Sequence, residues 1–123
     1  MDRGFEELKC WQLAREYRKA IYKVTKTFPG DELFGLTSQL RRAACSVTSN
    51  IAEGYGRYRF QDRAQFCIVA RGSLNESLDH LYAALDENYI SRETFEKLYK
   101  QGREVERVLN GYISHLRTKS GRE

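Results

Sequence analysis

The sequence predicts an all-α protein, an antiparallel up-down four-helix bundle formed by one domain that spans residues 1–123. Two observations predict this class: apolar residues recur at helical spacing in four long segments, and the chain contains a single proline. A third is the shortness of the connections, which forces neighbouring helices to run antiparallel. With 41% hydrophobic and 31% charged residues, the composition is that of a globular protein and not of a disordered or membrane one.

The first two helices are predicted over residues 5–27 and 36–54. The apolar face of the first helix comprises Leu8, Trp11, Ala14, Tyr17, Ile21 and Val24. Pro29 ends this helix because its ring cannot continue the helical hydrogen bonding. At the end of the second helix, Gly54 and Gly56 are able to adopt the positive φ of a C-terminal cap.

The last two helices are predicted over residues 59–87 and 91–117. Ser91 is a suitable N-cap for the fourth helix, whose apolar positions alternate at steps of three and four. These positions are Phe95, Leu98, Gly102, Val105, Leu109, Tyr112 and Leu116. Gly102 costs about 1 kcal/mol in helix propensity relative to alanine, so we expect it to admit a neighbouring helix or a large ring such as Trp11. The residues that follow this helix are expected to fray.

Two of the predicted apolar faces contain a polar residue. Asn50 falls on the face of the second helix, and Arg71 interrupts a heptad-like run in the third. A neutral polar group that is buried without a partner costs roughly 2 kcal/mol, and a charge costs more. One interpretation is an interhelical polar network that comprises Arg42, Asn50, Glu53, Arg71 and Glu76. The alternative is that the charged heads extend to water along their methylene stems.

Arginines and aromatic residues alternate in the turn between the second and third helices. The segment from Tyr55 to Phe60 offers stacking faces for bases and donors for phosphate, which are the ingredients of single-stranded nucleic-acid binding. The predicted nucleic-acid-binding residues are Arg41, Tyr55, Arg57, Tyr58, Arg59 and Arg63. The alternative is that the two outer aromatic residues staple the helix ends while the arginines are merely solvated.

The positive charge is concentrated around this turn. From residue 41 to residue 71 there are six arginines against Glu53 and Asp62, an excess equal to the net charge of +4 of the whole chain. A net charge of this size does not by itself prove a polyanionic partner, so its distribution carries more weight.

No recognised catalytic, metal-binding or nucleotide-binding motif is present in the sequence. His80 and His115 are the only histidines, neither has a ligand at metal spacing, and His80 is expected to face solvent. No glycine-rich loop precedes a lysine and serine pair, so no cofactor is expected. We therefore expect no enzyme, and the alternative that remains is phosphate chemistry at Glu53 and Arg71.

Other features bear on location and assembly. Residues 1–10 lack the hydrophobic core of a secretory signal, and no apolar run approaches a membrane span, so a cytoplasmic protein without a membrane partner is expected. The cysteines, which are expected to be reduced small apolar residues, are Cys10, Cys45 and Cys67. Three tyrosines fall off the main apolar stripes and suit subunit contacts, namely Tyr22, Tyr82 and Tyr99.

Several short runs carry a family resemblance. They are Phe28-Pro29, Gly35-Leu36, Gln39-Leu40-Arg41-Arg42-Ala43, Ser49-Asn50-Ile51-Ala52-Glu53-Gly54 and Ala70-Arg71-Gly72-Ser73-Leu74. With these runs the chain resembles the four-helix bundle proteins of the 23S rRNA intervening-sequence family, from Trp11-Gln12 to the last helix. Thr48 is a departure, since relatives often carry proline there, and it puts a local bend of the second helix in doubt.

The resemblance implies an up-down bundle that assembles as a ring, typically a homopentamer. It also implies distant kinship with the accessory protein of diversity-generating retroelements, which works with a reverse transcriptase and nucleic acid. We therefore expect a non-enzymatic homo-oligomeric binding module for RNA, DNA or a nucleic-acid-handling enzyme. The alternative is a purely structural oligomeric scaffold, in which a buried polar network fixes the register.

Overall fold

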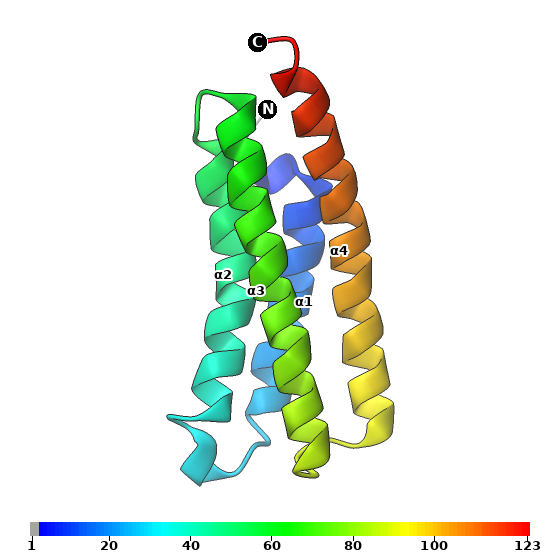
Figure 1. Cartoon of the computed structure of the whole chain (residues 1–123). Helices are drawn as coiled ribbons and strands as arrows, with labels where there is room; N and C mark the ends of the chain where they lie inside the picture. The colour runs from blue at the N-terminus through cyan, green and yellow to red at the C-terminus, as the bar shows by residue number, and fades with distance from the viewer. Residues whose placement is uncertain (1–2) are drawn as a thin grey trace.

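A computed structural model describes residues 3–123 of the chain. Its elements are η1 (Phe5–Glu7), α1 (Lys9–Thr25), η2 (Gly30–Glu32), α2 (Leu36–Tyr55), α3 (Phe60–Asp86) and α4 (Arg92–Ser120). The four long helices lie side by side and their connections alternate between the two ends, so neighbours run antiparallel (Figure 1). The described residues contain no strand, and the predicted all-α four-helix bundle is confirmed. None of the described helices is long and apolar enough to cross a membrane.

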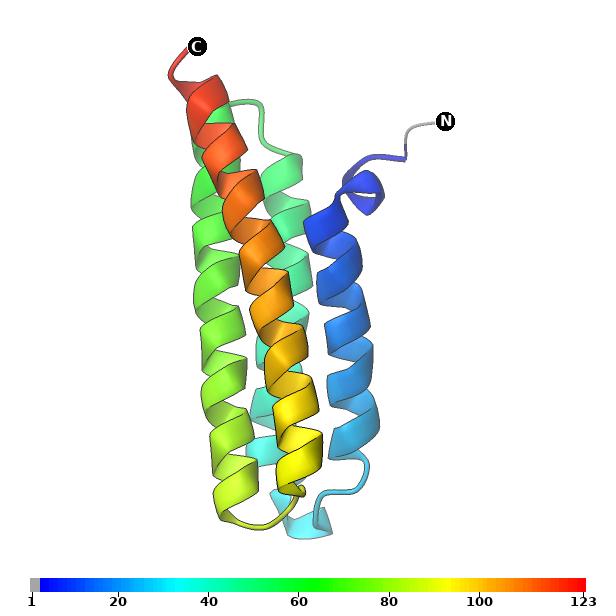
Figure 2. The ribbon, with the colours of Figure 1, turned by 90° about the vertical axis from the view of Figure 1, so that its right-hand side faces the viewer.

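The start of α1 and the end of α4 lie at the end of the bundle that carries the α2–α3 connection (Figure 1). Helices α2 and α3 pack against each other most extensively of the adjacent pairs, and α1 and α4 least extensively. Figure 2 shows that α1 and α4 separate toward the end that carries the α2–α3 connection. The bundle is therefore closed on its α2–α3 side and more open on its α1–α4 side.

Three helix boundaries differ from the predicted ones by two residues or more, and the others by at most one. The first helix begins at Lys9 and not at residue 5, because a separate 3-10 turn (η1) precedes it, and it ends at Thr25 and not at residue 27. The hydroxyl of Thr25 donates to the carbonyl of Ile21 at 2.8 Å, a bond back into the helix that is common near helix ends. The fourth helix continues to Ser120, so residues that were expected to fray complete its last turn.

Two polar residues leave the buried faces on which the sequence placed them. Ile51 is fully buried whereas Asn50 is only half-buried, and in α3 Ala70 is fully buried whereas Arg71 lies at the margin. Later members of the same stripes are buried, namely Gly54, Leu74, Leu78 and Leu81. Only the two polar positions therefore leave the predicted faces, and an adjacent apolar residue takes the core position in each case.

Gly102 allows the close packing that the sequence predicted, although the ring that it receives is a different one. A Cβ atom at Gly102 would lie 2.7 Å from Cδ2 of Leu78 and 3.3 Å from Cε1 of Tyr17. The predicted Trp11 instead packs against Phe5, with ring centroids 5.1 Å apart. Gly102 therefore makes room for the fully buried Tyr17 and for a leucine of α3.

Candidate nucleic-acid interface at the α2–α3 turn

A glycine fixes how α2 meets α3 beside the turn. A Cβ atom at Gly54 would lie 2.8 Å from Cβ of Phe66 and 3.0 Å from the carbonyl oxygen of Arg63. The helices can approach this closely only because the side chain is absent. The positive φ predicted for the following cap is not found, since Gly56 has φ −75° and its amide bonds to Ala52 and Glu53 by continuing the helical pattern.

Two arginines hold the turn in shape. Nε of Arg63 donates to the carbonyl of Arg57 at 2.7 Å, and the same guanidinium lies 5.2 Å from the ring centroids of both Tyr55 and Phe60. Arg57 pairs with Glu53 at 2.9 Å and covers the ring of Phe66. These contacts use both cations within the chain, so Arg57 and Arg63 position the turn.

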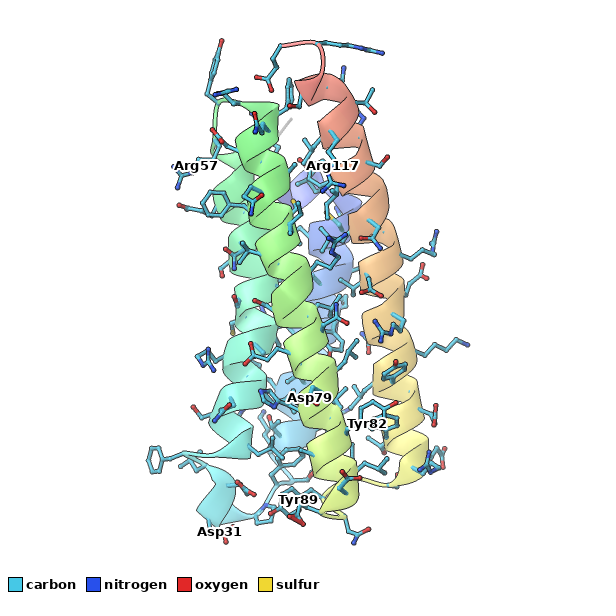
Figure 3. The ribbon with its side chains drawn as sticks, in the orientation of Figure 1. Asp31, Arg57, Asp79, Tyr82, Tyr89 and Arg117 are labelled. Atoms are coloured by element: carbon cyan, nitrogen blue, oxygen red, sulfur yellow. The ribbon has the colours of Figure 1, made fainter. Side chains whose placement is uncertain are left out.

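Tyr58 and Arg59 project from this fixed turn into solvent. Tyr58 is 94% exposed, and Arg59 is exposed with a 3.3 Å hydrogen bond to the amide oxygen of Gln61. Figure 3 shows the labelled Arg57 and Arg117 at the same end of the bundle, so the last turns of α4 stand near the α2–α3 turn. The turn and the end of α4 together line a shallow hollow of about 720 Å³, whose walls include Tyr58, Phe60, Arg63, Lys119, Arg122 and Glu123.

The contribution of α4 to this surface was missed by the sequence analysis. Lys119 and Arg122 lie in the hollow, and within residues 3–123 neither they nor Arg59 take part in an ion pair. A carboxylate oxygen of Glu123 accepts from the amide of Phe60 at 2.9 Å and so caps α3. In any up-down bundle of four helices the last helix ends beside the second connection, so topology could have found these cations. We call Tyr58, Arg59, Lys119 and Arg122 the basic end.

Arg41 does not belong to the basic end. It lies near the start of α2, where its Nε donates to the hydroxyl of Thr25 at 2.8 Å and its guanidinium covers the ring of Tyr22 at 4.9 Å. The start and the end of a 20-residue helix are about 30 Å apart. The structure therefore separates Arg41 from the five other residues predicted to bind nucleic acid.

The predicted polar network does not form as one unit. The amide nitrogen of Asn50 donates within α2 to the carbonyl oxygen of Ser46 at 2.8 Å and to its hydroxyl at 2.9 Å. That hydroxyl in turn bonds to Ser73 of α3 at 2.9 Å. Glu53 pairs with Arg57 in the turn, so none of these contacts reaches Arg71. Asn50 thus satisfies its amide nitrogen within α2, at the margin of the helix, and not in the core.

The remaining members of the predicted network form a separate pair. Arg42 lies 3.5 Å from Glu76, an exposed contact of the kind that contributes little to stability. Glu76 also contacts His80 at 3.3 Å, and only 16% of the His80 side chain is exposed. The expectation that His80 faces solvent is wrong, because most of its side chain is buried.

Arg71 joins a polar cluster between α3 and α4 that the sequence analysis did not predict. It donates to Asn110 at 2.9 Å, and nearby Arg103 donates to Glu106 at 2.8 Å and to Asn75 at 3.1 Å. Burial alone would raise the pKa of Glu106, but hydrogen bonds from Asn75 and Arg103 lower this pKa below its usual range. The cluster is a satisfied structural contact at the margin of the α3–α4 interface.

Two of the three cysteines are buried thiols. Burial raises the pKa of Cys10 to about 11 and that of Cys67 to about 12, so both stay protonated near neutral pH. A thiol rather than a thiolate is a poor nucleophile, and these two residues act as small apolar core residues.

The fold and this surface together define a class: a four-helix bundle with an exposed aromatic residue and free cations at one end. A sequence model of the 23S rRNA-intervening sequence protein family matches residues 6–111, and the chain belongs to this family. Among solved structures, the chain is similar to a protein of unknown function from the S23 ribosomal protein family of Bacteroides thetaiotaomicron VPI-5482. The two are 22% identical, with a TM-score of 0.78 over 85% of this chain and 97% of the other. No curated protein matches the sequence.

Proposed function

We propose that this protein is a non-enzymatic, homo-oligomeric binding module whose basic end docks single-stranded nucleic acid. The observation that carries the proposal is Tyr58, which is 94% exposed on a turn whose shape Arg57 and Arg63 fix. An aromatic ring held in water beside free cations is what base stacking and phosphate contact both need.

A second basic surface, on α1, is a weaker candidate for the same role. Arg18, Lys19, Lys23 and Lys26 line a hollow there around Tyr22. Arg41 covers the Tyr22 ring at 4.9 Å, however, and the Tyr22 hydroxyl bonds to the sulfur of Cys45 at 3.3 Å. The Tyr22 ring is therefore engaged within the chain, whereas the Tyr58 ring is free to stack on a base.

Assembly of several copies would raise the affinity of such a surface for nucleic acid. If several copies present the basic end on one side of a ring, as the family resemblance implies for a homopentamer, modest contacts by each copy combine through multivalency. A nucleic-acid-handling enzyme of the reverse-transcriptase kind is the protein partner that fits a module of this type.

The test is a salt titration of binding to single-stranded RNA and DNA of equal length, followed by fluorescence anisotropy. We expect saturable binding at about 50 mM salt and an affinity at least about 10-fold weaker at about 200 mM, because released counterions drive phosphate binding. Arg59→Gln combined with Arg122→Gln should flatten this dependence, whereas the matched pair Lys19→Gln and Lys26→Gln on the α1 surface should leave it steep. Absence of binding at the lower salt would remove the proposal.

The second candidate function is a purely structural scaffold. It is favoured by one observation: Arg57 and Arg63, two of the arginines predicted to bind phosphate, are used within the chain. A scaffold would show an oligomeric mass by light scattering together with no nucleic-acid binding at any salt concentration. The two measurements therefore separate the candidates.

A further inference from the structure

Two large apolar residues protrude from the loop between α1 and α2. Leu33 is 50% exposed and Phe34 is 92% exposed. Removing large apolar side chains from water is favourable, so a partner that covered these two would gain by it. We call Leu33 and Phe34 the apolar knob.

The knob stands on a loop with fixed geometry. The carboxylate of Glu32 accepts from the amide of Leu36 at 3.1 Å and from the hydroxyl of Tyr89 at 2.7 Å. The Tyr89 bond is the largest cause that lowers the pKa of Glu32, so the carboxylate is charged near neutral pH. A Cβ atom at Gly35 would lie 2.6 Å from the same carboxylate, so a larger residue there would displace the Glu32 side chain from these bonds. A loop ordered in this way loses little entropy when a partner covers it.

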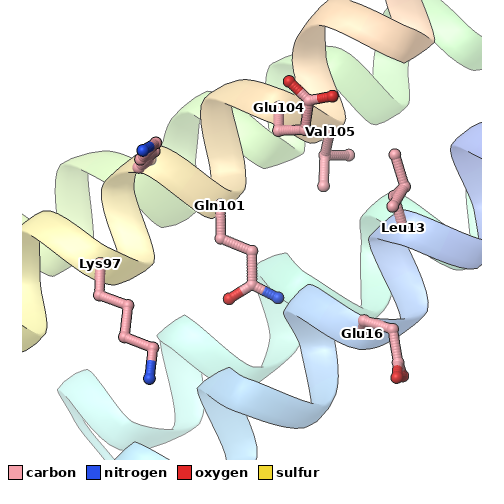
Figure 4. A pocket seen from close by; sticks show the side chains of 7 residues that line it. Leu13, Glu16, Lys97, Gln101, Glu104 and Val105 are labelled. Carbon is pink, nitrogen blue, oxygen red and sulfur yellow. The ribbon is translucent and has the colours of Figure 1, made fainter.

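An apolar groove lies between α1 and α4 at the same end of the bundle. One part has a volume of about 390 Å³, and its walls include Ala20, Lys23, Val24, Lys97, Leu98 and Gln101. A cavity of about 150 Å³ is enough to hold benzene, so a phenyl ring fits here. Lys97 and Gln101 continue the groove into a second part of about 440 Å³, where Leu13 and Val105 face each other across the two helices (Figure 4).

The charges of the two surfaces are complementary. Asp31 and Glu32 precede the knob. Lys23 and Lys97 flank the part of the groove that has a volume of about 390 Å³, and no acidic residue lines this part. Attraction of this kind brings the correct surfaces together and disfavours wrong pairs.

The knob cannot enter the groove of its own chain. Asp31 marks the loop at the lower left of Figure 3, whereas α4 stands on the right side of the bundle. Thr27 and Thr94 line the groove near this same end, so the two surfaces lie at one height on different sides. We propose that the apolar knob of one copy inserts into the α1–α4 groove of the next copy.

Such a contact is head-to-tail, because each copy contributes its apolar knob to one neighbour and its groove to the other. Repeated with a rotation about one axis that closes after a whole number of copies, it produces a ring of parallel bundles. The parallel arrangement would also place all basic ends on one side of the ring. This inference rests on the proposed homo-oligomer and names the residues that would join its copies.

The test is the mass of the full chain by light scattering over a range of concentrations. Phe34→Ala is expected to raise the dissociation constant between copies by about 10-fold or more, because it removes the buried ring. Circular dichroism should show an unchanged fold, since the side chain is exposed in the single chain. Tyr58→Ala removes an equally exposed ring from the other end and should leave the mass unchanged.

A charge exchange makes the test independent of the apolar contact. Lys97→Glu and Asp31→Lys should each weaken assembly, and the double variant should recover most of it, because the pair is restored with reversed signs. A multimeric wild type whose mass is unaffected by Phe34→Ala would overturn the assignment of the contact while leaving the homo-oligomer intact. A wild type that is monomeric at all concentrations would overturn the homo-oligomer itself, and nucleic-acid binding is measured separately.

Discussion

Tyr58→Ala is expected to weaken the binding of single-stranded nucleic acid by about 5- to 150-fold for each copy. Stacking of one base on an aromatic ring contributes about 1–3 kcal/mol, and Tyr58 is the ring at the basic end that is free to stack. In a ring of several copies the loss multiplies, since every copy loses its stacking contact at once. Anisotropy titrations at about 50 mM salt measure the change directly.

The conservative control is Tyr58→Phe, which keeps the stacking face and removes only the hydroxyl. It should retain most of the affinity, and its thermal stability should match that of the wild type because the side chain makes few contacts within the chain. Equal losses in both variants would mean that the hydroxyl and not the ring makes the contact. Unchanged binding by Tyr58→Ala would place the nucleic acid on another surface.

Gly54→Ala is expected to lower the free energy of unfolding by about 1–3 kcal/mol, although alanine is the better helix former. The added Cβ would meet Cβ of Phe66 at 2.8 Å and the Arg63 carbonyl oxygen at 3.0 Å. Neither atom can rotate away, so α3 must shift as a whole. Urea denaturation at one fixed protein concentration measures the change, since assembly contributes to apparent stability.

Gly72→Ala is the matched control in the middle of α3. A Cβ atom there meets nothing within 4 Å, so the variant should gain up to about 1 kcal/mol from helix propensity alone. The two glycine variants therefore have opposite expected signs. If Gly54→Ala were as stable as Gly72→Ala, the close approach of α2 and α3 would not limit the fold.

The fold class was predictable because helical spacing and short connections are properties of the local sequence. The exact faces were less predictable: Asn50 and Arg71 were assigned to the core, whereas their neighbours Ile51 and Ala70 occupy it. Over a short stretch, a spacing of three and four residues fits a helix face that contains Asn50 and one that contains Ile51 nearly equally well. Only the packing of the neighbouring helix decides between adjacent positions.

The candidate site was predictable in part for a similar reason. Tyr58 and Arg59 follow from the turn itself, whereas Lys119 and Arg122 come from a segment some 60 residues away that topology brings to the same end. Whether an arginine is free also depends on its partners in space. Arg57 and Arg63 are engaged by Glu53 and by the backbone of the turn, and neither contact follows from composition or charge count.

The central claim is that single-stranded nucleic acid docks on the basic end, and photo-crosslinking tests it most directly. RNA that carries 5-iodouridine would be bound at about 50 mM salt, irradiated, and the crosslinked peptide identified by mass spectrometry. The account predicts a crosslink to Tyr58. A crosslink concentrated on Tyr22 of α1, with none at Tyr58, would contradict it.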